Sequence, residues 1–304
     1  GLKLTLYSDP TCSRLNEAIA RHYEVKPENV ISGNGSDEIL AFAFRAFCGE
    51  GKGVAYADIT YGFYKAQVAL FGLDATIIPL REDFSLNVDD YMDFPGTIVI
   101  ANPNAPTGLC LTLPEIEAIV ASNPDGVVII DEAYVDFGAE SAIPLVNRYD
   151  NLLVTGTFSK SRSMAGARLG FGIASPALIA DLHTVRYSPS PYSVNRMTAD
   201  AGCAALREND YYMENCKKII ENREWTQNEL KKLGFVTTKS MTNFVFAKHN
   251  EKSGEFIYKK LRENNILVRH FDKELIMDYN RITIGSKEQM ATMISVLEKI
   301  LKED

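Results

Sequence analysis

The chain has 304 residues, of which 46% are hydrophobic and 24% charged, which is enough apolar material for about two globular domains. Its formal net charge of −8 at pH 7, without a basic run, argues against nucleic acid as the main partner. The five cysteines show no paired spacing, which indicates a reducing compartment such as the cytoplasm, and no apolar run is long enough to span a membrane.

Short apolar runs alternate with helical patterns over the first 185 residues. The runs that we predict as strands are 53–57, 75–79, 97–101, 127–130, 152–155 and 169–173, with a first strand near Val30. The segments that we predict as helices are 37–47, 63–71, 113–121 and 177–185. Several strands are apolar throughout, as in strands covered on both faces, so we predict an α/β domain with a mostly parallel central sheet flanked by helices.

The pattern changes after residue 193. Helices are predicted over 193–205, 210–233, 254–264 and 287–301, and strands over 243–247, 266–269 and 281–284. These segments indicate a smaller α+β domain. We therefore expect a large domain of residues 28–207 and a small domain of residues 208–304, to which we also assign the N-terminal segment 1–27. Because the chain starts at Gly1 without a methionine, we expect a further segment to precede it.

A glycine-rich run, Ser32-Gly-Asn-Gly-Ser-Asp37, opens the first predicted helix. Free backbone N–H groups and a favourable helix dipole at such a start can bind an anion. Gly35, Ser36 and Asp37 are therefore candidate phosphate ligands, although a capped turn is the commoner use of this pattern.

Two motifs follow the next strands along the chain. Tyr61, in Thr-Tyr-Gly-Phe-Tyr, begins a predicted helix, and its ring is placed to cover a flat ligand. Tyr64 is the alternative, and both rings could instead pack in the core. The run Asn102-Pro-Asn-Ala-Pro-Thr-Gly108 predicts a fixed turn at the same sheet edge.

The next two strands end in reactive residues. Asp131-Glu-Ala-Tyr follows one of them, and Thr157-Phe-Ser-Lys ends the other. Ligands of open α/β sheets bind outside the carboxyl ends of the strands, so these side chains should meet. A lysine for a Schiff base, an acid for a ring nitrogen and donors for a phosphate are the groups that hold pyridoxal 5'-phosphate, PLP.

Each of these residues has a predicted role. Lys160 would form the Schiff base and, once released, carry the proton at the substrate Cα. Asp131 would keep the ring nitrogen protonated, and Tyr134 would hydrogen-bond to the ring hydroxyl. The predicted phosphate donors of the lysine loop are Thr157, Ser159 and Arg168. Each motif alone is more often a solvated loop or a turn, and only their conjunction predicts this chemistry.

With these motifs the chain resembles the class I and II aminotransferases, which are fold-type I PLP enzymes, and is most similar to their histidinol-phosphate branch. The matching runs are residues 6–10, 32–38, 60–62, 102–108, 131–134, 157–160, 165–170 and 281–285. The resemblance implies transfer of an amino group between histidinol phosphate and 2-oxoglutarate or glutamate, in histidine biosynthesis, and no metal.

The resemblance also implies roles outside the strand-end motifs. Arg281 would bind the α-carboxylate of the dicarboxylic substrate, with Asn243 facing it, and Arg269 would bind the substrate phosphate. Tyr7 would reach the cofactor phosphate of a neighbouring subunit, which makes the protein a homodimer with shared active sites. Without the resemblance, both arginines would be interpreted as members of surface ion pairs.

The chain departs from the family in two places. The family usually has Asn where Ala105 stands, so either Tyr134 alone or Asn104 serves the ring hydroxyl. The N-terminal arm that covers the site in the family has no counterpart in this sequence. Two alternatives remain: a threonine-phosphate decarboxylase on the same scaffold, and a non-catalytic PLP-fold binding module. The intact set of lysine, aspartate, tyrosine and arginine argues against the second.

Overall fold

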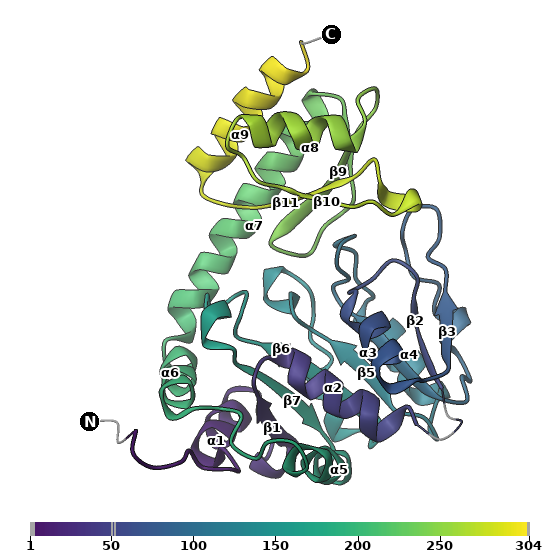
Figure 1. Cartoon of the computed structure of the whole chain (residues 1–304), viewed down its shortest axis with the longest axis vertical. Helices are drawn as coiled ribbons and strands as arrows, with labels where there is room; N and C mark the ends of the chain where they lie inside the picture. Colours follow the sequence, from purple (N-terminus) through teal and green to yellow (C-terminus); the bar gives the residue numbers. More distant parts are fainter. Residues whose placement is uncertain (1–3, 50, 52, 303–304) are drawn as a thin grey trace.

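The structure is a computed structural model that describes residues 4–49, 51 and 53–302. Within these residues a seven-stranded sheet and a four-stranded sheet form two parts, and the long helix α7, Asn209–Lys232, runs along both (Figure 1). No helix in the described part of the chain is long and apolar enough to cross a membrane.

The large sheet has the strand order β1-β7-β6-β5-β4-β2-β3. Its strands are β1 Val30–Gly33, β2 Val54–Ala57, β3 Ala75–Ile78, β4 Thr97–Ala101, β5 Val128–Asp131, β6 Leu152–Thr157 and β7 Gly170–Ala174. Strand β7 runs opposite to the others: it pairs antiparallel with β1 and β6, and the other described pairs of this sheet are parallel. The predicted α/β fold with a mostly parallel sheet is confirmed.

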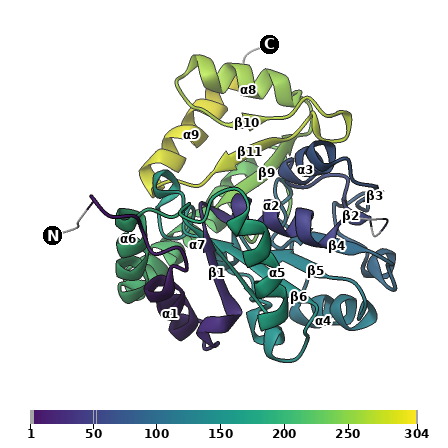
Figure 2. The same cartoon turned by 60° about the horizontal axis from the view of Figure 1, so that its bottom comes forward.

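Helices cover both faces of this sheet (Figure 2). Those of the first face are α2 Ser36–Phe47, α3 Phe63–Phe71 and α5 Pro176–Tyr187; those of the second are α1 Ser13–His22, α4 Leu113–Ser122 and α6 Arg196–Arg207. Along β4, Val99 packs in the first core and Ile98 and Ile100 in the second. Burial on both faces explains why the strands are apolar throughout.

The position of α1 differs from our expectation that residues 1–27 accompany the small domain. Its Leu15 and Ile19 are buried in a core of the large sheet. The amide of Asn16 donates to the backbone oxygen of Val30 at 3.2 Å. We therefore propose that α1 belongs to the large domain.

The small sheet is antiparallel, with the order β10-β11-β9-β8. Its strands are β8 Phe235–Thr237, β9 Phe244–His249, β10 Arg269–His270 and β11 Asn280–Thr283. Helices α7, α8 Gly254–Glu263 and α9 Lys287–Ile300 enclose its core. Short 3-10 helices occur at Pro27–Asn29, Val88–Tyr91, Val135–Phe137, Ile143–Asn147, Ala165–Ala167 and Glu274–Ile276.

The elements β8 and α1 were not predicted. Strand β8 has only three residues, too few for a period-2 pattern to be detected.

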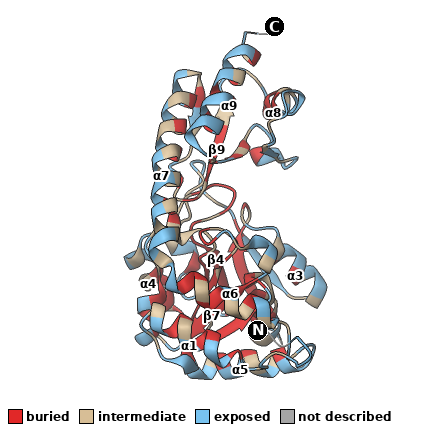
Figure 3. Ribbon diagram, turned by 90° about the vertical axis from the view of Figure 1, so that its left-hand side faces the viewer, coloured by how far each residue is buried: buried red, intermediate tan, exposed pale blue. Residues whose placement is uncertain are grey.

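Helix α7 exposes much of its surface along its length (Figure 3), and its buried residues are Cys216, Arg223, Thr226 and Leu230. One of these four is a charged residue in the middle of the helix.

Candidate active site

One cavity lies where β4, β5 and β6 end, and it reaches the edge of the small sheet. It is lined by Ser36, Asp37, Tyr61, Ala101, Pro103, Ala105, Asp131, Ala133, Tyr134, Thr157, Ser159, Lys160, Arg168 and Arg281. Most of the residues singled out in the sequence therefore meet in one place, because the carboxyl ends of parallel strands share one sheet edge.

Asp131 is the last residue of β5 and only 4% exposed. The Tyr64 hydroxyl donates to its Oδ2 at 2.8 Å, and the Thr155 hydroxyl donates to its Oδ1 at 3.2 Å. Burial raises the pKa of Asp131 to about 6, although these two hydrogen bonds oppose the shift. No cation forms an ion pair with Asp131 among the described residues. The carboxyl group is held in place, but its charge is uncompensated.

The two candidate tyrosines have different positions. Tyr64 is fully buried, and its hydroxyl is engaged with Asp131. Tyr61 lines the cavity and is 40% exposed, so it is the aromatic ring that a ligand would meet. Its hydroxyl donates to Oδ1 of Asp37 at 3.1 Å.

Lys160 follows β6 and is half-buried at the cavity wall. Its Nζ makes no hydrogen bond within the described residues and lies 5.5 Å from the centre of the Tyr134 ring. Burial lowers the pKa of Lys160, and the positive charge of Arg281 lowers it further. Both effects favour the neutral, nucleophilic amine that a Schiff base requires.

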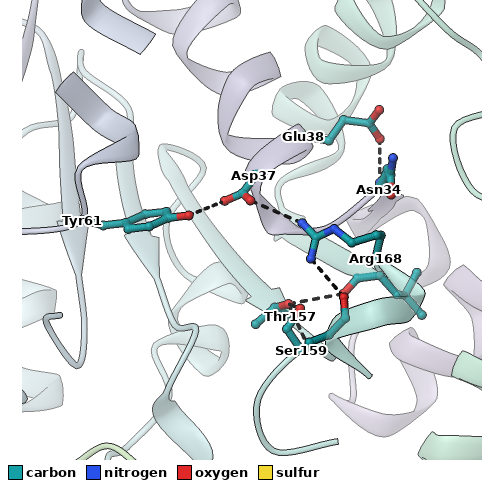
Figure 4. Close-up of polar contacts among 9 residues, drawn as sticks. Asn34, Asp37, Glu38, Tyr61, Thr157, Ser159 and Arg168 are labelled. Carbon is teal, nitrogen blue, oxygen red and sulfur yellow. Dashed lines mark hydrogen bonds and ion pairs between the residues drawn. The ribbon is translucent and has the colours of Figure 1, made fainter. Parts of the chain in front are cut away.

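The start of α2 forms one side of the cavity (Figure 4). Its N-cap, Gly35, has φ 84° and no side-chain cap, so the first N–H groups of the helix remain open to an anion. A Cβ atom at Gly35 would lie 2.7 Å from Nη2 of Arg168, and one at Gly170 would lie 2.2 Å from the backbone nitrogen of Ser36. Glycine is therefore needed at both positions to bring backbone, arginine and sheet together.

The loop that carries Lys160 forms the other side of this candidate anion site. Nη2 of Arg168 lies 3.4 Å from Oδ2 of Asp37, and the Thr157 and Ser159 hydroxyls are 3.0 Å apart (Figure 4). Two hydroxyls, a guanidinium group and the helix start make a donor set that suits a phosphate.

The two arginines of the small sheet stand opposite each other. Arg269 of β10 pairs with Arg281 of β11, so their side chains leave the sheet on the same face. Like charges in this position are destabilising without an anion between or beside them. The guanidinium of Arg281 lies 5.0 Å from the centre of the Phe244 ring, and its Nε is buried without a hydrogen-bond partner in the described structure.

Arg269 does not line the Lys160 cavity but an adjacent one. That second cavity is lined by Asp58, Ile59, Thr60, Gly62, Pro106, Tyr258, Val268, Arg269, His270, Phe271, Asp272, Lys273 and Ile276. Its wall includes the neighbours of Tyr61 and Ala105 in the chain, both of which line the Lys160 cavity. The two cavities therefore share a wall.

Two further predicted residues, Tyr7 and Asn243, are outside the described lining of both cavities. Tyr7 is 78% exposed, and its ring stacks on that of Tyr192 with 4.7 Å between centres. Its backbone oxygen accepts a hydrogen bond of 2.7 Å from Arg196. Asn243 accepts a backbone hydrogen bond from Ile284 at 2.9 Å, and its side chain is not among the described lining of either cavity.

Ala105 lines the cavity, and Asn104 does not replace the missing amide. The Asn104 side chain accepts from the Thr60 hydroxyl at 2.7 Å and donates to the Ile59 oxygen and the Thr107 hydroxyl at 2.9 and 3.0 Å. The amide thus holds the loop after β4 against the segment before Tyr61. The Tyr134 side chain lines the same cavity as Ala105, and burial raises its pKa.

The side chains that hold the Asp131 carboxyl group in place were not predicted from the sequence. Thr155 lies beside Asp131 because β5 and β6 pair in that register, which no local pattern reveals. Glu132, in the same motif, is also buried, but it accepts hydrogen bonds of 2.6 Å from the Ser141 hydroxyl and the Ala142 backbone, and burial raises its pKa to about 8. Glu132 therefore fixes the following loop and does not face the cavity.

Known proteins resemble this chain over nearly its whole length. The profile of a family described as aminotransferase class I and II matches residues 2–297. Histidinol-phosphate aminotransferase of Brachyspira hyodysenteriae is 47% identical over 300 residues, which are 98% of this chain and 85% of that protein.

Solved structures show the same fold. Histidinol-phosphate aminotransferase from Clostridium acetobutylicum has a TM-score of 0.91 at 23% identity, covering 99% of this chain and 92% of that one. The enzyme of this name from Sinorhizobium meliloti, in complex with pyridoxal-5'-phosphate, has a TM-score of 0.89 at 23% identity, covering 98% and 83%.

Proposed function

The chain belongs to the class I and II aminotransferases, and on that premise we propose that it transfers an amino group between histidinol phosphate and 2-oxoglutarate or glutamate, with PLP as cofactor. The observation that carries this proposal is the single cavity in which Lys160, Asp131, Tyr134 and Arg281 meet. The likeness to histidinol-phosphate aminotransferases supports the choice of amine substrate and a role in histidine biosynthesis.

The residues of the cavity fit PLP. Asp131 is a buried carboxyl group without a cationic partner in the described chain, which a protonated ring nitrogen would supply. The open start of α2, with Thr157, Ser159 and Arg168, suits the phosphate, and Lys160 has an amine free of hydrogen bonds. When bound, PLP acts as the electron sink for charge that develops at the substrate Cα.

The side chains then divide the work. Lys160 would hold the cofactor, and its Nζ, once released, would move the proton at the substrate Cα. Asp131 would keep the ring nitrogen protonated, and Tyr134 would hydrogen-bond to the ring hydroxyl. Tyr61 would cover the ring face, since its side chain lines the cavity.

Two anionic groups are recognised at the small-domain edge. We assign the α-carboxylate of glutamate or 2-oxoglutarate to Arg281, because its guanidinium enters the Lys160 cavity and its Nε lacks a partner. We assign the substrate phosphate to Arg269, in the adjacent cavity. Asn243, one residue before β9, is assigned to the carboxylate end with support from the family resemblance alone.

Transamination is tested most directly as a half-reaction. Purified holoenzyme is mixed with histidinol phosphate, and conversion of the cofactor to pyridoxamine phosphate is followed by absorbance. Added 2-oxoglutarate should reverse the change and yield glutamate. Release of CO2 from threonine phosphate would instead indicate the decarboxylase, and an unchanged spectrum with every amine would indicate a binding module.

We also propose a cytoplasmic homodimer. Large exposed apolar side chains gather around the N-terminal segment and the start of α6, namely Leu4, Leu6, Tyr7, Tyr192 and Met197. Tyr7 and Tyr192 stack on each other, and exposed apolar side chains that gather in this way are typical of an interaction site. In a dimer with two-fold symmetry the patch would bring Tyr7 to the partner's cofactor phosphate.

Mixed dimers test the shared site. Lys160→Ala and Tyr7→Ala subunits should each be inactive or weak alone, but a dimer with one of each would contain one intact site. Refolding the two together should restore activity. No gain on mixing, or a monomer with full PLP affinity, would contradict the shared site.

A further inference from the structure

Arg223 lies in the middle of α7 and is only 4% exposed. Its Nη1 donates two hydrogen bonds of 2.8 Å, one to the backbone oxygen of Phe137 and one to that of Thr242. Phe137 follows β5 of the large sheet, and Thr242 precedes β9 of the small sheet. One side chain therefore joins the backbones of the two parts. The helix that carries it, α7, runs along both of them (Figure 1).

On the large-domain side, the bond reaches a turn that contains Tyr134. The 3-10 helix Val135–Phe137 begins directly after Tyr134, and the backbone nitrogen of Phe137 donates to the Tyr134 oxygen at 3.2 Å. The carbonyl group that Arg223 holds is thus one short turn away from a cavity-lining residue.

On the small-domain side, the bond reaches a turn locked by side chains. The hydroxyls of Ser240 and Thr242 both donate to the backbone oxygen of Phe244, at 2.6 and 3.1 Å, and both residues are buried. Phe244 therefore follows any movement of Thr242.

The Phe244 ring touches both sides of the Lys160 cavity. It lies edge-on to the Tyr134 ring with 5.2 Å between centres, and 5.0 Å from the Arg281 guanidinium. The backbone nitrogen of Ile284, just after the Arg281 strand, donates to Asn243 at 2.9 Å. The chain of contacts from Arg223 thus ends at Arg281.

The charge of Arg223 is costly where it lies. Burial lowers its pKa, its Nε has no hydrogen-bond partner, and it forms no ion pair within the described residues. A hydrophobic side chain of similar size would pack α7 without this penalty. What an apolar side chain lacks is a donor nitrogen that can hold two carbonyl groups at once, as Nη1 of Arg223 does.

We propose that Arg223 is a positioning residue that sets Arg281 relative to Tyr134, and thereby the recognition of the dicarboxylic substrate. This inference rests on the proposed transamination. Two further contacts, from Thr238 and Met241 to Thr107 and Gly108, tie the same turn to the loop after β4. Arg223 supplies a hydrogen-bonded link from this turn to the Tyr134 segment, beside the contact between the Phe244 and Tyr134 rings.

Arg223→Met tests the proposal in the holoenzyme. KM for 2-oxoglutarate and its dissociation constant by calorimetry should rise by about tenfold, since a displaced partner weakens a contact without removing it. kcat should change less, and the pH at which the bound cofactor changes its absorbance should stay the same. Arg223→Lys, which keeps a charged donor, should recover part of the loss.

Thr226→Val is the matched control. Thr226 is buried on α7 one turn from Arg223, and its hydroxyl donates to the backbone oxygen of Asn222 in the same helix, at 2.7 Å. The control should lose stability without a change in KM. An equal rise of KM in both variants would show that Arg223 only stabilises the fold.

A double-mutant cycle further distinguishes an Arg223 that positions Arg281 from an Arg223 that only stabilises the fold. If Arg223 acts through Arg281, then in an Arg281→Gln background Arg223→Met should raise KM for 2-oxoglutarate by less than about twofold. Additive losses would overturn the proposal. A wild-type enzyme that neither binds nor aminates 2-oxoglutarate would refute the proposed function itself, whereas an active wild type with an unchanged Arg223→Met variant would refute only this inference.

Discussion

The two walls of the Lys160 cavity differ in how far their polar groups are already paired. On the large-domain wall, Asp131 accepts from two hydroxyls and Arg168 meets Asp37. On the small-domain wall, Arg281 has a buried Nε without a partner in the described structure, and Arg269 stands opposite it with the same charge. Within the described residues the first wall keeps an unpaired amine at Lys160 and an uncompensated charge at Asp131, but hydroxyl groups hold its carboxyl group in place, whereas the second wall has unsatisfied positive charge.

This difference between the walls corresponds to how long each kind of ligand stays bound, since the cofactor remains in the site and the substrates alternate. A cofactor that stays bound benefits from a site fixed in advance, because little order remains to be gained on binding. Substrates that alternate need a wall that accepts more than one anionic group. The arrangement therefore predicts that variants of the large-domain wall damage every substrate equally, whereas variants of the small-domain wall discriminate between substrates.

The largest effect is expected at Lys160. Lys160→Ala removes the amine that holds the cofactor and moves the proton, so turnover should stop with all substrates. Borohydride treatment followed by peptide mapping should find no cofactor-labelled lysine. Lys65, exposed on α3, offers the control, and Lys65→Ala should retain activity and labelling. A labelled peptide from another lysine would contradict the assignment.

Asp131→Asn should slow proton removal from every amine substrate to the same extent. The loss of a buried charge opposite the ring nitrogen should raise the barrier by several kcal/mol, or about a thousandfold in rate. Stopped-flow absorbance of the half-reaction measures this. Rates close to those of the wild type would show that Asp131 has no role in proton removal. Rate losses that differ between substrates would contradict the prediction that variants of the large-domain wall affect every substrate equally.

The small-domain wall is tested by exchanging one arginine at a time. Arg281→Gln should weaken glutamate and 2-oxoglutarate, and Arg269→Gln should weaken phosphorylated substrates, each by about 2–5 kcal/mol if the pair is desolvated. Dissociation constants for both substrate types in both variants give the answer. Equal losses for both types would mean that the two guanidinium groups act as one site.

The smallest effect concerns stability without cofactor. The pKa of Asp131 is raised from 3.8 to about 6, so this group stabilises the fold below about pH 4 and loses that contribution as pH rises through 6. Relative to wild type, the Asp131→Asn apoprotein should therefore gain up to about 3 kcal/mol in free energy of unfolding between about pH 4 and pH 7. Denaturant unfolding at several pH values measures this gain, and a difference independent of pH would contradict the raised pKa.

The sequence was informative where a strand ends in a reactive residue. Asp131 and Lys160 stand next to apolar runs, and the rule that strand ends share one sheet edge was enough to bring them together. The glycine-rich start of α2 was visible for a similar reason, since the pattern and the structure are both local.

Contacts between neighbouring strands, between separate loops and between the two domains could not be predicted from the sequence. The bond from Thr155 to Asp131 depends on the register of two strands, and the tether from Asn104 to Thr60 joins separate loops. Arg223 stands among other polar residues in α7, so no periodicity distinguishes it from a solvated side chain. Its burial follows only from how the two domains lie against the helix.

Arg269 and Arg281, which lie at paired positions on neighbouring strands, affect the rate at which substrates associate with the protein. The chain as a whole carries a formal charge of −8, so a dianion approaching at random meets repulsion over much of the surface. Two guanidinium groups on paired positions of neighbouring strands create a local attractive field beside the two cavities, which favours the approach of anions and is screened by salt. Capture of phosphorylated and dicarboxylic substrates should thus slow as ionic strength rises, while the chemical step on bound substrate proceeds unchanged.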